Sequence, residues 1–222
     1  MSKYFSQCGQ DQFLNEKVFK GKKSGVFVDI GANDGVTLSN SFFFEKELGW
    51  KGVCFEPLNE AFDKLQKSRQ SININACISD PERKDFFLSV KGYGEMLSGL
   101  KSSYDERHLQ RLYQTIQEHG GEVKEIEVQC YNINQILKKH SIQEIDFISL
   151  DTEGGELEIL KSIDFDFFHI KAITVENNYK TPEFRKFLST KGFEFIKDLD
   201  ADELYLNKAD FGWLKRIGIK RA

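Results

Sequence analysis

Short apolar runs alternate with amphipathic stretches along most of the chain. Each apolar run has the length of a strand and ends in glycine, acidic or amide residues, while the stretches between them repeat apolar side chains at helical spacing. Strands are predicted at 26–30, 52–56, 72–78, 145–150 and 172–175, and helices at about 37–48, 59–68, 133–139, 156–162 and after Pro182. This alternation predicts an α/β fold in which helices cover a mostly parallel sheet.

The last two apolar runs depart from this alternation. Residues 193–199 and 203–206 flank the polar stretch 200–202, which is a turn signal. We therefore expect the two runs to pair as antiparallel strands. A mostly parallel seven-stranded sheet that ends in an antiparallel hairpin is the Rossmann-like architecture of a large class of methyltransferases. A chain of 222 residues is long enough for one such domain, so we predict a single domain over 1–222.

An insertion separates the third and fourth predicted strands. The stretch 81–129 is too long for a plain crossover connection, and it contains strand-like runs at 86–90 and 122–129 around a polar, partly helical centre. Segments of this kind at the carboxyl edge of a sheet often select substrate, so we interpret 81–129 as a substrate cap. A segment over 1–24 and a basic tail over 210–222 lie outside the alternating pattern.

The turn after the first strand is the strongest indication of function. An apolar run that carries Asp29 breaks into the turn 31–35, and a second run ends about twenty residues later in Glu56, the spacing at which a carboxylate holds ribose hydroxyls. The turn lacks the glycines of a dinucleotide fingerprint and the Gly-Lys-Ser/Thr of a phosphate loop, and the anion Asp34 would repel a pyrophosphate. These residues favour S-adenosylmethionine, which has no phosphate and carries positive charges.

Oxygen-rich side chains follow the fourth and fifth predicted strands. Because the carboxyl ends of parallel strands meet at one edge of a sheet, we expect them to line a common crevice. Asp151, Glu176 and Asn177 together form a plausible Mg²⁺ site, since this ion takes oxygen ligands. Two simpler interpretations stay open: Asp151 caps a helix and Asn177 belongs to an ordinary turn, or the acids contact the ammonium end of the cofactor.

Candidates for a general base come from the same loops. Asp151 and Glu153 are the catalytic candidates, because burial would raise their pKa toward neutrality and let them take the proton of an acceptor hydroxyl. Glu156 is less favourable, since it should already lie on the following helix. His108 and His119 belong to the insertion and reach a substrate only if the insertion folds over the site.

Composition and charge exclude several other classes. A formal net charge of −4 and a pI near 5.7 make nucleic acid an unlikely partner, because nucleic-acid binding usually needs a clustered positive face. The four cysteines show no C-x-x-C spacing and are expected to be reduced thiols. No apolar run approaches the ~20 residues of a membrane-spanning helix. The first residues lack the core of a signal peptide, so we expect a cytoplasmic protein.

Several motifs occur in an order that points to one family. They are Ser6 to Asp11, Phe27 to Gly35, Ser39-Asn40, Leu48 to Gly52, Glu56-Pro57 and Leu150 to Glu158. With these motifs the chain resembles the FkbM-type methyltransferases, which are S-adenosylmethionine-dependent O-methyltransferases of Rossmann-like fold. The resemblance covers about residues 5–178, and the insertion shows no pattern that it matches.

The resemblance implies roles for individual residues and an acceptor class. The residues that would line the methionine part of the cofactor are Asp29, Gly31, Asn33, Asp34 and Gly35. Glu56 would hold the ribose, while Gln7 and Asp11 would cover the cofactor. Such families methylate hydroxyls of sugars, polyketides and other small metabolites, so we expect a small-molecule or glycan acceptor, with a sugar foremost. A nicotinamide oxidoreductase, an RNA methyltransferase and a catalytically silent cofactor-binding module are the alternatives.

Overall fold

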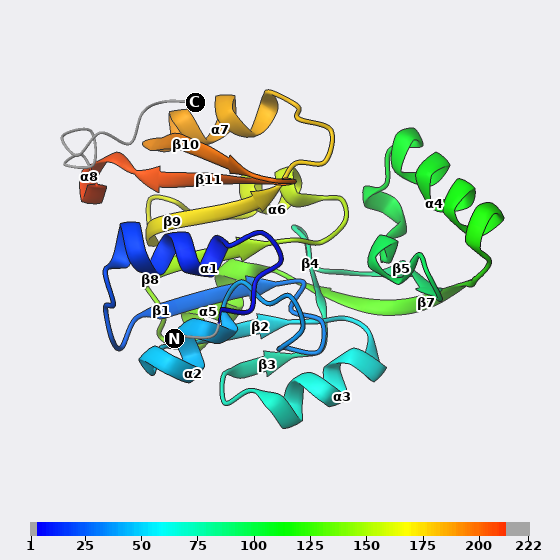
Figure 1. The fold of residues 1–222 in the computed structure, drawn as a ribbon, viewed down its shortest axis with the longest axis horizontal. Coiled ribbons are helices and arrows are strands. Elements are labelled where there is room, and N and C mark those ends of the chain that lie inside the picture. Colours follow the sequence, from blue (N-terminus) through cyan, green and yellow to red (C-terminus); the bar gives the residue numbers. More distant parts are fainter. Residues whose placement is uncertain (1–3, 212–222) are drawn as a thin grey trace.

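The computed structural model of the protein describes residues 4–211 and is built on a seven-stranded sheet (Figure 1). The strands follow one another across this sheet in the order β10-β11-β9-β8-β1-β2-β3. Their bounds are Val26–Ile30 (β1), Lys51–Phe55 (β2), Ile72–Ile74 (β3), Glu144–Leu150 (β8), His169–Glu176 (β9), Phe193–Leu199 (β10) and Asp202–Asn207 (β11). Strand β11 runs antiparallel to both of its neighbours, and the other pairings are parallel. The predicted Rossmann-like α/β fold with a terminal hairpin is confirmed.

Helices cover both faces of this sheet, and one helix with two short 3-10 turns belongs to the insertion. The helices are α1 (Gln10–Phe13), a π-helical stretch (Leu14–Phe19), α2 (Phe42–Leu48), α3 (Asn59–Ser68), α5 (Ile133–Lys139), α6 (Glu156–Ser162), α7 (Glu183–Thr190) and α8 (Lys208–Phe211), and in the insertion α4 (Glu106–His119), with the 3-10 turns at Glu95–Leu97 and Lys101–Ser103. One apolar core packs α5, α6 and α7 on the sheet, and a second packs the π-helical stretch, α2 and α3 on its other face. Burial of this apolar surface is the main source of stability.

No helix among residues 4–211 is long and apolar enough to cross a membrane. The cytoplasmic location inferred from the sequence stays a prediction. Most of the predicted basic tail, at 212–222, lies outside the described residues.

The insertion forms a second sheet beyond the carboxyl ends of the parallel strands (Figure 1). Its four strands are β4 (Cys77–Ile78), β7 (Glu122–Tyr131), β5 (Arg83–Lys91) and β6 (Gly99–Leu100), in that order across the sheet. One face packs on α4 through Val90, Leu97 and Leu112. The opposite face turns toward the seven-stranded sheet and carries Phe87, Leu100 and Val128. The sequence indicated β5, β7 and the helix but neither the short strand β6 nor the pairing, and the role of the insertion as a substrate cap stays a prediction.

The prediction of one strand over 72–78 is wrong. Ile72–Ile74 pair with β2 in the large sheet, whereas Cys77–Ile78 pair with β7 in the second sheet. The side-chain amide of Asn75 donates to the carbonyl oxygens of Glu56 and Pro57, at 2.9 and 3.1 Å. These bonds tie the chain to the end of β2 and let it leave the large sheet.

The helix predicted over 37–48 begins later, at Phe42. The carboxylate of Asp34 accepts hydrogen bonds from the N–H groups of Val36 and Thr37, at 2.9 and 2.8 Å. The Ser39 hydroxyl oxygen accepts one from the N–H of Phe42 at 3.1 Å. Side chains that satisfy backbone donors in this way favour turns over helix, so the residues before Phe42 stay non-helical.

Candidate active site

The turn after β1 lies directly against the loop after β8. The N–H of Asp151 donates to the carbonyl oxygen of Ile30 at 3.0 Å, and the N–H of Gly31 donates to that of Phe55 at 3.1 Å. Gly31 has a φ of +90°, and a Cβ there would lie 1.7 Å from the carbonyl oxygen of Asp151. Only glycine fits this position. The backbones of the turn and the loop are therefore packed against each other and fixed at the carboxyl edge of the sheet.

Glu56 is fixed beside this turn, at the end of β2. Its two carboxylate oxygens accept hydrogen bonds from the N–H of Asn33 at 2.9 Å and from the N–H of Leu58 at 2.8 Å. Burial raises the pKa of Glu56 to about 7, although the two backbone donors act in the opposite direction. Each carboxylate oxygen keeps acceptor capacity for a further donor. Glu56 is thus a preorganised acceptor for hydroxyl groups.

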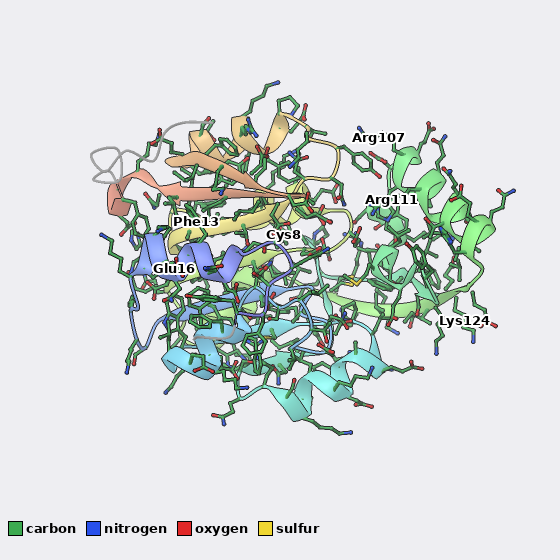
Figure 2. All side chains as sticks on the ribbon, in the orientation of Figure 1. Cys8, Phe13, Glu16, Arg107, Arg111 and Lys124 are labelled. Carbon is green, nitrogen blue, oxygen red and sulfur yellow. The ribbon has the colours of Figure 1, made fainter. Side chains whose placement is uncertain are left out.

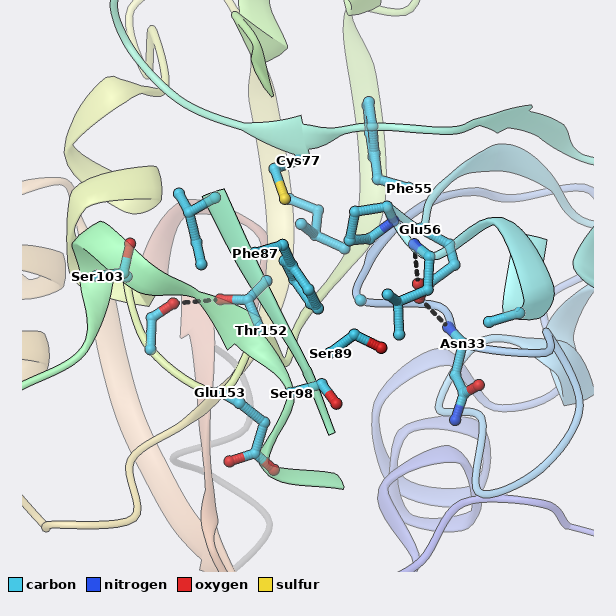
Figure 3. A pocket seen from close by; sticks show the side chains of 18 of the residues that line it. Asn33, Phe55, Glu56, Cys77, Phe87, Ser89, Ser98, Ser103, Thr152 and Glu153 are labelled. Atoms are coloured by element: carbon cyan, nitrogen blue, oxygen red, sulfur yellow. Dashed lines mark hydrogen bonds between the residues drawn. The ribbon is translucent and has the colours of Figure 1, made fainter. Parts of the chain in front are cut away.

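A pocket of about 600 Å³ lies between the two sheets (Figure 3). One wall consists of the turn after β1, the segment after β2 and the loop after β8, which contribute polar groups such as Asn33, Glu56 and Thr152. The other wall is the inner face of the second sheet, with Phe87 and Ile126. Ligand pockets of about 300–1,000 Å³ hold cofactor-sized molecules. The pocket therefore offers a polar side and an apolar side to one such ligand.

Glu156 shapes the loop that follows β8. One of its carboxylate oxygens accepts three hydrogen bonds: from the N–H of Thr152 at 3.1 Å, from the Thr152 hydroxyl at 2.7 Å and from the N–H of Gly154 at 2.8 Å. Glu156 is the first residue of α6, as the sequence indicated. Because its oxygen is used by the loop itself, Glu156 positions this loop, and Glu153 is the glutamate of the loop that lines the pocket (Figure 3).

Three carboxylates meet where the loops after β8 and β9 approach each other. One oxygen from each of Asp151, Glu153 and Glu176 lies within 4.8 Å of the others. Burial, together with repulsion among the acids, raises the pKa of all three, to about 7 for Glu153 and about 11 for Glu176. Among the described residues, the Oε2 atom of Glu153 is buried without a hydrogen-bond partner. The cluster is suited to take up a proton or to balance a cation.

The predicted metal ligands are only partly brought together. Asp151 and Glu176 belong to the cluster, but Asn177 does not, because its side-chain amide exchanges two hydrogen bonds with the backbone of Thr181 at 3.0 and 2.9 Å. Glu153 takes its place. The interpretation of Asp151 as a helix cap is wrong, since Gly155 occupies the N-cap of α6. Three carboxylates supply the oxygen donors that a hard divalent cation takes.

Two of the predicted cofactor residues serve the turn itself. Asp29 is buried, accepts a hydrogen bond from the Ser41 hydroxyl and lies near Arg69, and burial raises its pKa. In Asp34, burial acts to raise the pKa, but hydrogen bonds from Thr37 and from the backbone lower it overall. Neither Asp29 nor Asp34 belongs to the lining of the described pocket. Their contact with the cofactor, and that of the neighbouring Gly35, stays a prediction.

The N-terminal segment is anchored by Asp11 and by a residue that the sequence analysis did not single out. Asp11 is fully buried and accepts the Ser6 hydroxyl at 2.6 Å, while Gln7 is exposed. Gln10 donates to Asp202 at 3.0 Å, and burial raises the pKa of Asp202 to about 6. Gln10 belongs to the motif Ser6 to Asp11, and Asp202 belongs to the predicted turn 200–202. Nothing in either stretch of sequence indicated that these two side chains would be in contact. That this segment covers the cofactor stays a prediction.

The insertion borders the carboxylate cluster without bringing a histidine to it. A Cβ on Gly154 would lie 3.3 Å from the carbonyl oxygen of Ser103, so the insertion packs on the loop after β8. His108 is 3% exposed and stacks on Tyr104 with ring centroids 4.1 Å apart. Burial lowers the pKa of His108. These contacts give His108 a packing role and favour the carboxylates as the reactive groups.

Comparison with known proteins agrees with the architecture of this site. A family model described as the methyltransferase FkbM domain matches residues 29–199, from β1 to the end of β10. The chain is 23% identical over 197 residues to the methyltransferase sdnD of Sordaria araneosa, a match that covers 77% of this chain and 74% of that protein. The chain therefore belongs to the FkbM methyltransferase family, and its class of activity is methyl transfer.

Two solved structures were also found to be similar. The crystal structure of the methyltransferase FkbM from Methylobacillus flagellatus superposes with a TM-score of 0.48 at 12% identity, over 82% of this chain and 43% of that one. A protein of the NADB-Rossmann superfamily from Streptococcus agalactiae superposes with a TM-score of 0.43 at 15% identity, over 93% and 68% of the two chains. The chain thus spans less than half the length of the first of these structures.

Proposed function

We propose that the protein is an S-adenosylmethionine-dependent O-methyltransferase that acts on a hydroxyl group of a small molecule, foremost a sugar of a glycan or glycoconjugate. The observation that carries this proposal is the position of Glu153. Its carboxylate is buried, lacks a hydrogen-bond partner among the described residues and faces the same pocket as Glu56. One pocket thus combines an acceptor for ribose hydroxyls with a base for an acceptor hydroxyl.

The pocket supports S-adenosylmethionine as the cofactor. Glu56 can accept both ribose hydroxyls, and the apolar wall with Leu58, Phe87 and Ile126 suits an adenine ring. Asp151 also lines the pocket, and its carboxylate would balance the positive charges of the methionine part of the cofactor. When bound, the cofactor supplies an electrophilic methyl group on a sulfonium. The protein residues hold it, orient the acceptor and exclude water.

Glu153 is the group that we assign to proton removal. Its pKa of about 7 lies near the value at which a general base is most effective, since about half of the groups are ionised at neutral pH and the carboxylate is still basic enough to accept a proton. The proton moves from the acceptor hydroxyl to a carboxylate oxygen of Glu153. The positive charge of Arg111, on α4 of the insertion, counteracts the effect of burial on this pKa (Figure 2). Closure of the insertion over the acceptor would therefore tune the base.

A sugar acceptor is supported by the residues around the cluster. Tyr179 follows Glu176 in the loop after β9 and is 36% exposed. The guanidinium of Arg107 lies 4.1 Å from the centroid of its ring, so α4 holds the tyrosine from one side. A fixed, partly exposed tyrosine offers an apolar face and a hydroxyl, which suits a pyranose ring. The net negative charge makes RNA the less favoured acceptor.

A divalent cation is a further part of the proposal. When a Mg²⁺ ion is bound, Asp151, Glu153 and Glu176 would hold it, because their oxygens are close enough to share one ion, and Glu153 would then be a ligand and not the free base. Bound there, it would lower the pKa of an acceptor hydroxyl. Asn177 is not included, because its amide is already used by Thr181.

The test is methyl transfer from isotope-labelled S-adenosylmethionine to a panel of mono- and oligosaccharides, polyketide-like phenols and RNA, with Mg²⁺ or with a chelator. We expect label in the saccharide pool with the wild type and a loss of about 100-fold or more with Glu153→Gln. Label in RNA alone would overturn the acceptor class. Binding of the cofactor without methyl transfer to any pool would favour the catalytically silent binding module. Equal rates of methyl transfer with Mg²⁺ and with the chelator would show that the reaction needs no divalent cation.

A further inference from the structure

Two cysteines face each other at the base of the insertion. Cys77 and Cys130 are direct partners in the parallel pairing of β4 with β7, and both are free thiols. Neighbouring strands lie about 4.8 Å apart, which is within the range of about 4.4–6.8 Å between the Cα atoms of a disulfide. The two thiols lie close enough to shift each other's pKa, that of Cys77 upward and that of Cys130 downward. The pair is thus positioned for a covalent bond with little backbone movement.

The same pair belongs to the wall of the pocket. Cys77 lines the pocket (Figure 3). Cys130 is fully buried behind it, among Phe87 and its neighbours on the inner face of the second sheet. Cys77 is therefore the thiol that a small molecule in the pocket can reach, while Cys130 is shielded from the pocket.

The pair also marks the point where the insertion joins the rest of the protein. Both chain crossings between the two parts run through β4 and β7, and the whole predicted insertion 81–129 lies between the two cysteines in sequence. A bond between them would close this segment into a covalent loop. Because the second sheet supplies the apolar wall of the pocket, a change at its base alters the shape of that wall.

We propose that Cys77 and Cys130 are a modification site: a hydroperoxide that enters the pocket converts them into a reversible disulfide, and this bond weakens cofactor binding. The second half of this statement rests on the proposed function. The first half stands on the register of β4 and β7 and on the place of Cys77 in the pocket.

The chemistry balances with hydrogen peroxide as the oxidant. The sulfur of Cys77 attacks one peroxide oxygen, the O–O bond breaks, and Cys77 becomes a sulfenic acid as water leaves. The sulfur of Cys130 then attacks the Cys77 sulfur, the S–O bond breaks, and the hydroxyl departs with the Cys130 proton as a second water. Two thiols and one peroxide give one disulfide and two waters. A dithiol reductant reverses the bond by exchange.

Disulfide formation has a direct consequence for the pocket. The two sulfurs must approach to about 2.05 Å, so the Cys77 side chain moves toward Cys130 and away from a bound ligand. Contacts between the ligand and the wall near Leu58 are lost. The covalent loop also restricts the unfolded chain, which stabilises the insertion against unfolding.

The remaining cysteines provide controls. Cys8 lies in the N-terminal segment, apart from the insertion, where its thiol donates to Asp200 (Figure 2). Burial and Asp200 raise the pKa of Cys8. Cys54 is fully buried in β2, and burial raises its pKa to about 12. Neither residue pairs with another cysteine in the described residues.

The test compares reduced and peroxide-treated protein as the full chain. Thiol titration in denaturant should fall from four to two in the wild type and from three to one in Cys8→Ser. Peptide mapping should join Cys77 to Cys130 in both proteins, and no disulfide should form in Cys130→Ser. S-adenosylhomocysteine, as the probe, should bind the oxidised wild type at least about tenfold more weakly, with recovery after dithiothreitol and no change in treated Cys130→Ser.

Four intact thiols after treatment, or a bond to Cys8, would overturn the site. A mapped disulfide with unchanged affinity would overturn its effect on the pocket. Failure of the reduced protein to bind the probe would instead count against the proposed function, while the mapping result would still decide the disulfide. If Cys130→Ser does not fold, Cys130→Val, which suits the apolar surroundings, replaces it.

Discussion

Gly31 and Asp151 meet backbone to backbone, so that a Cβ on Gly31 would lie 1.7 Å from the Asp151 carbonyl oxygen. We expect Gly31→Ala to lose about 2–4 kcal/mol of unfolding free energy and the binding of adenosine ligands, because both the clash and the φ of +90° oppose a side chain. Gly49→Ala is the control: its φ is +68° but no atom lies within 4 Å, so about 1 kcal/mol is expected. Urea denaturation measures both. Equal losses of unfolding free energy in Gly31→Ala and Gly49→Ala would contradict the close backbone contact between Gly31 and Asp151.

The buried carboxylates predict an unusual dependence of stability on pH. Burial raises the pKa of Glu56 and Glu153 to about 7 and that of Asp202 to about 6 in the folded state. The unfolded chain, with ordinary values near 4, therefore binds fewer protons between about pH 4 and 7. Unfolding free energy must fall as pH rises through this window.

We expect the ligand-free protein to be about 2–4 kcal/mol less stable at pH 8 than at pH 5.5, measured by urea denaturation. Glu153→Gln removes one of the raised groups and should reduce this difference. Stability that is flat or rises over this interval would contradict the burial of these acids as described.

Glu153→Gln should separate chemistry from binding. Without the carboxylate no group at this position takes the acceptor proton, so we expect kcat to fall by about 100-fold to 10,000-fold while the KM for S-adenosylmethionine changes less than about threefold. Wild-type kcat should rise with pH to a plateau with an apparent pKa near 7, because the base must be ionised, and the variant should lack this rise. Glu47→Gln, at an exposed position of α2 outside the lining of the pocket, is the control. If kcat is unchanged in Glu153→Gln, Glu153 is not the general base and another group removes the proton.

Glu156→Ala tests the loop after β8 rather than the chemistry. It leaves the N–H groups of Thr152 and Gly154 without their acceptor, so we expect a loss of about 2–3 kcal/mol in unfolding free energy. Glu156→Gln, which keeps an acceptor oxygen, should lose less than half of this. Thermal and urea denaturation of the two variants give the comparison, and equal losses would show that the hydrogen bonds do not order the loop.

The parts of the site that are formed by residues close together in the sequence could be predicted. β1 was predicted with the observed bounds, Val26–Ile30, because an apolar run and a glycine turn are local signals. The same locality explains where Glu56 lies. The second sheet was not foreseen, because the pairing of Arg83–Lys91 with Glu122–Tyr131 joins segments separated by the whole of α4, and no local pattern encodes such a pairing.

Side-chain direction was the other feature that the sequence did not reveal. Asn177 and Glu153 both follow strand ends, yet only Glu153 joins Asp151 and Glu176, because the Asn177 amide closes a turn on Thr181. Position along the chain predicts which residues reach the carboxyl edge of the sheet. It does not predict which of them local hydrogen bonds will turn away from it.

The central claim is that Glu56 and the turn after β1 bind an adenosine cofactor without phosphates. Isothermal titration of the reduced protein with S-adenosylmethionine, S-adenosylhomocysteine and NAD⁺, at fixed pH and with or without Mg²⁺, tests it most directly. We predict binding of both adenosylated ligands in the micromolar range, a weakening of about tenfold or more in Glu56→Ala, and no binding of NAD⁺. Binding of NAD⁺ alone, or equal affinities of wild type and Glu56→Ala, would contradict the claim.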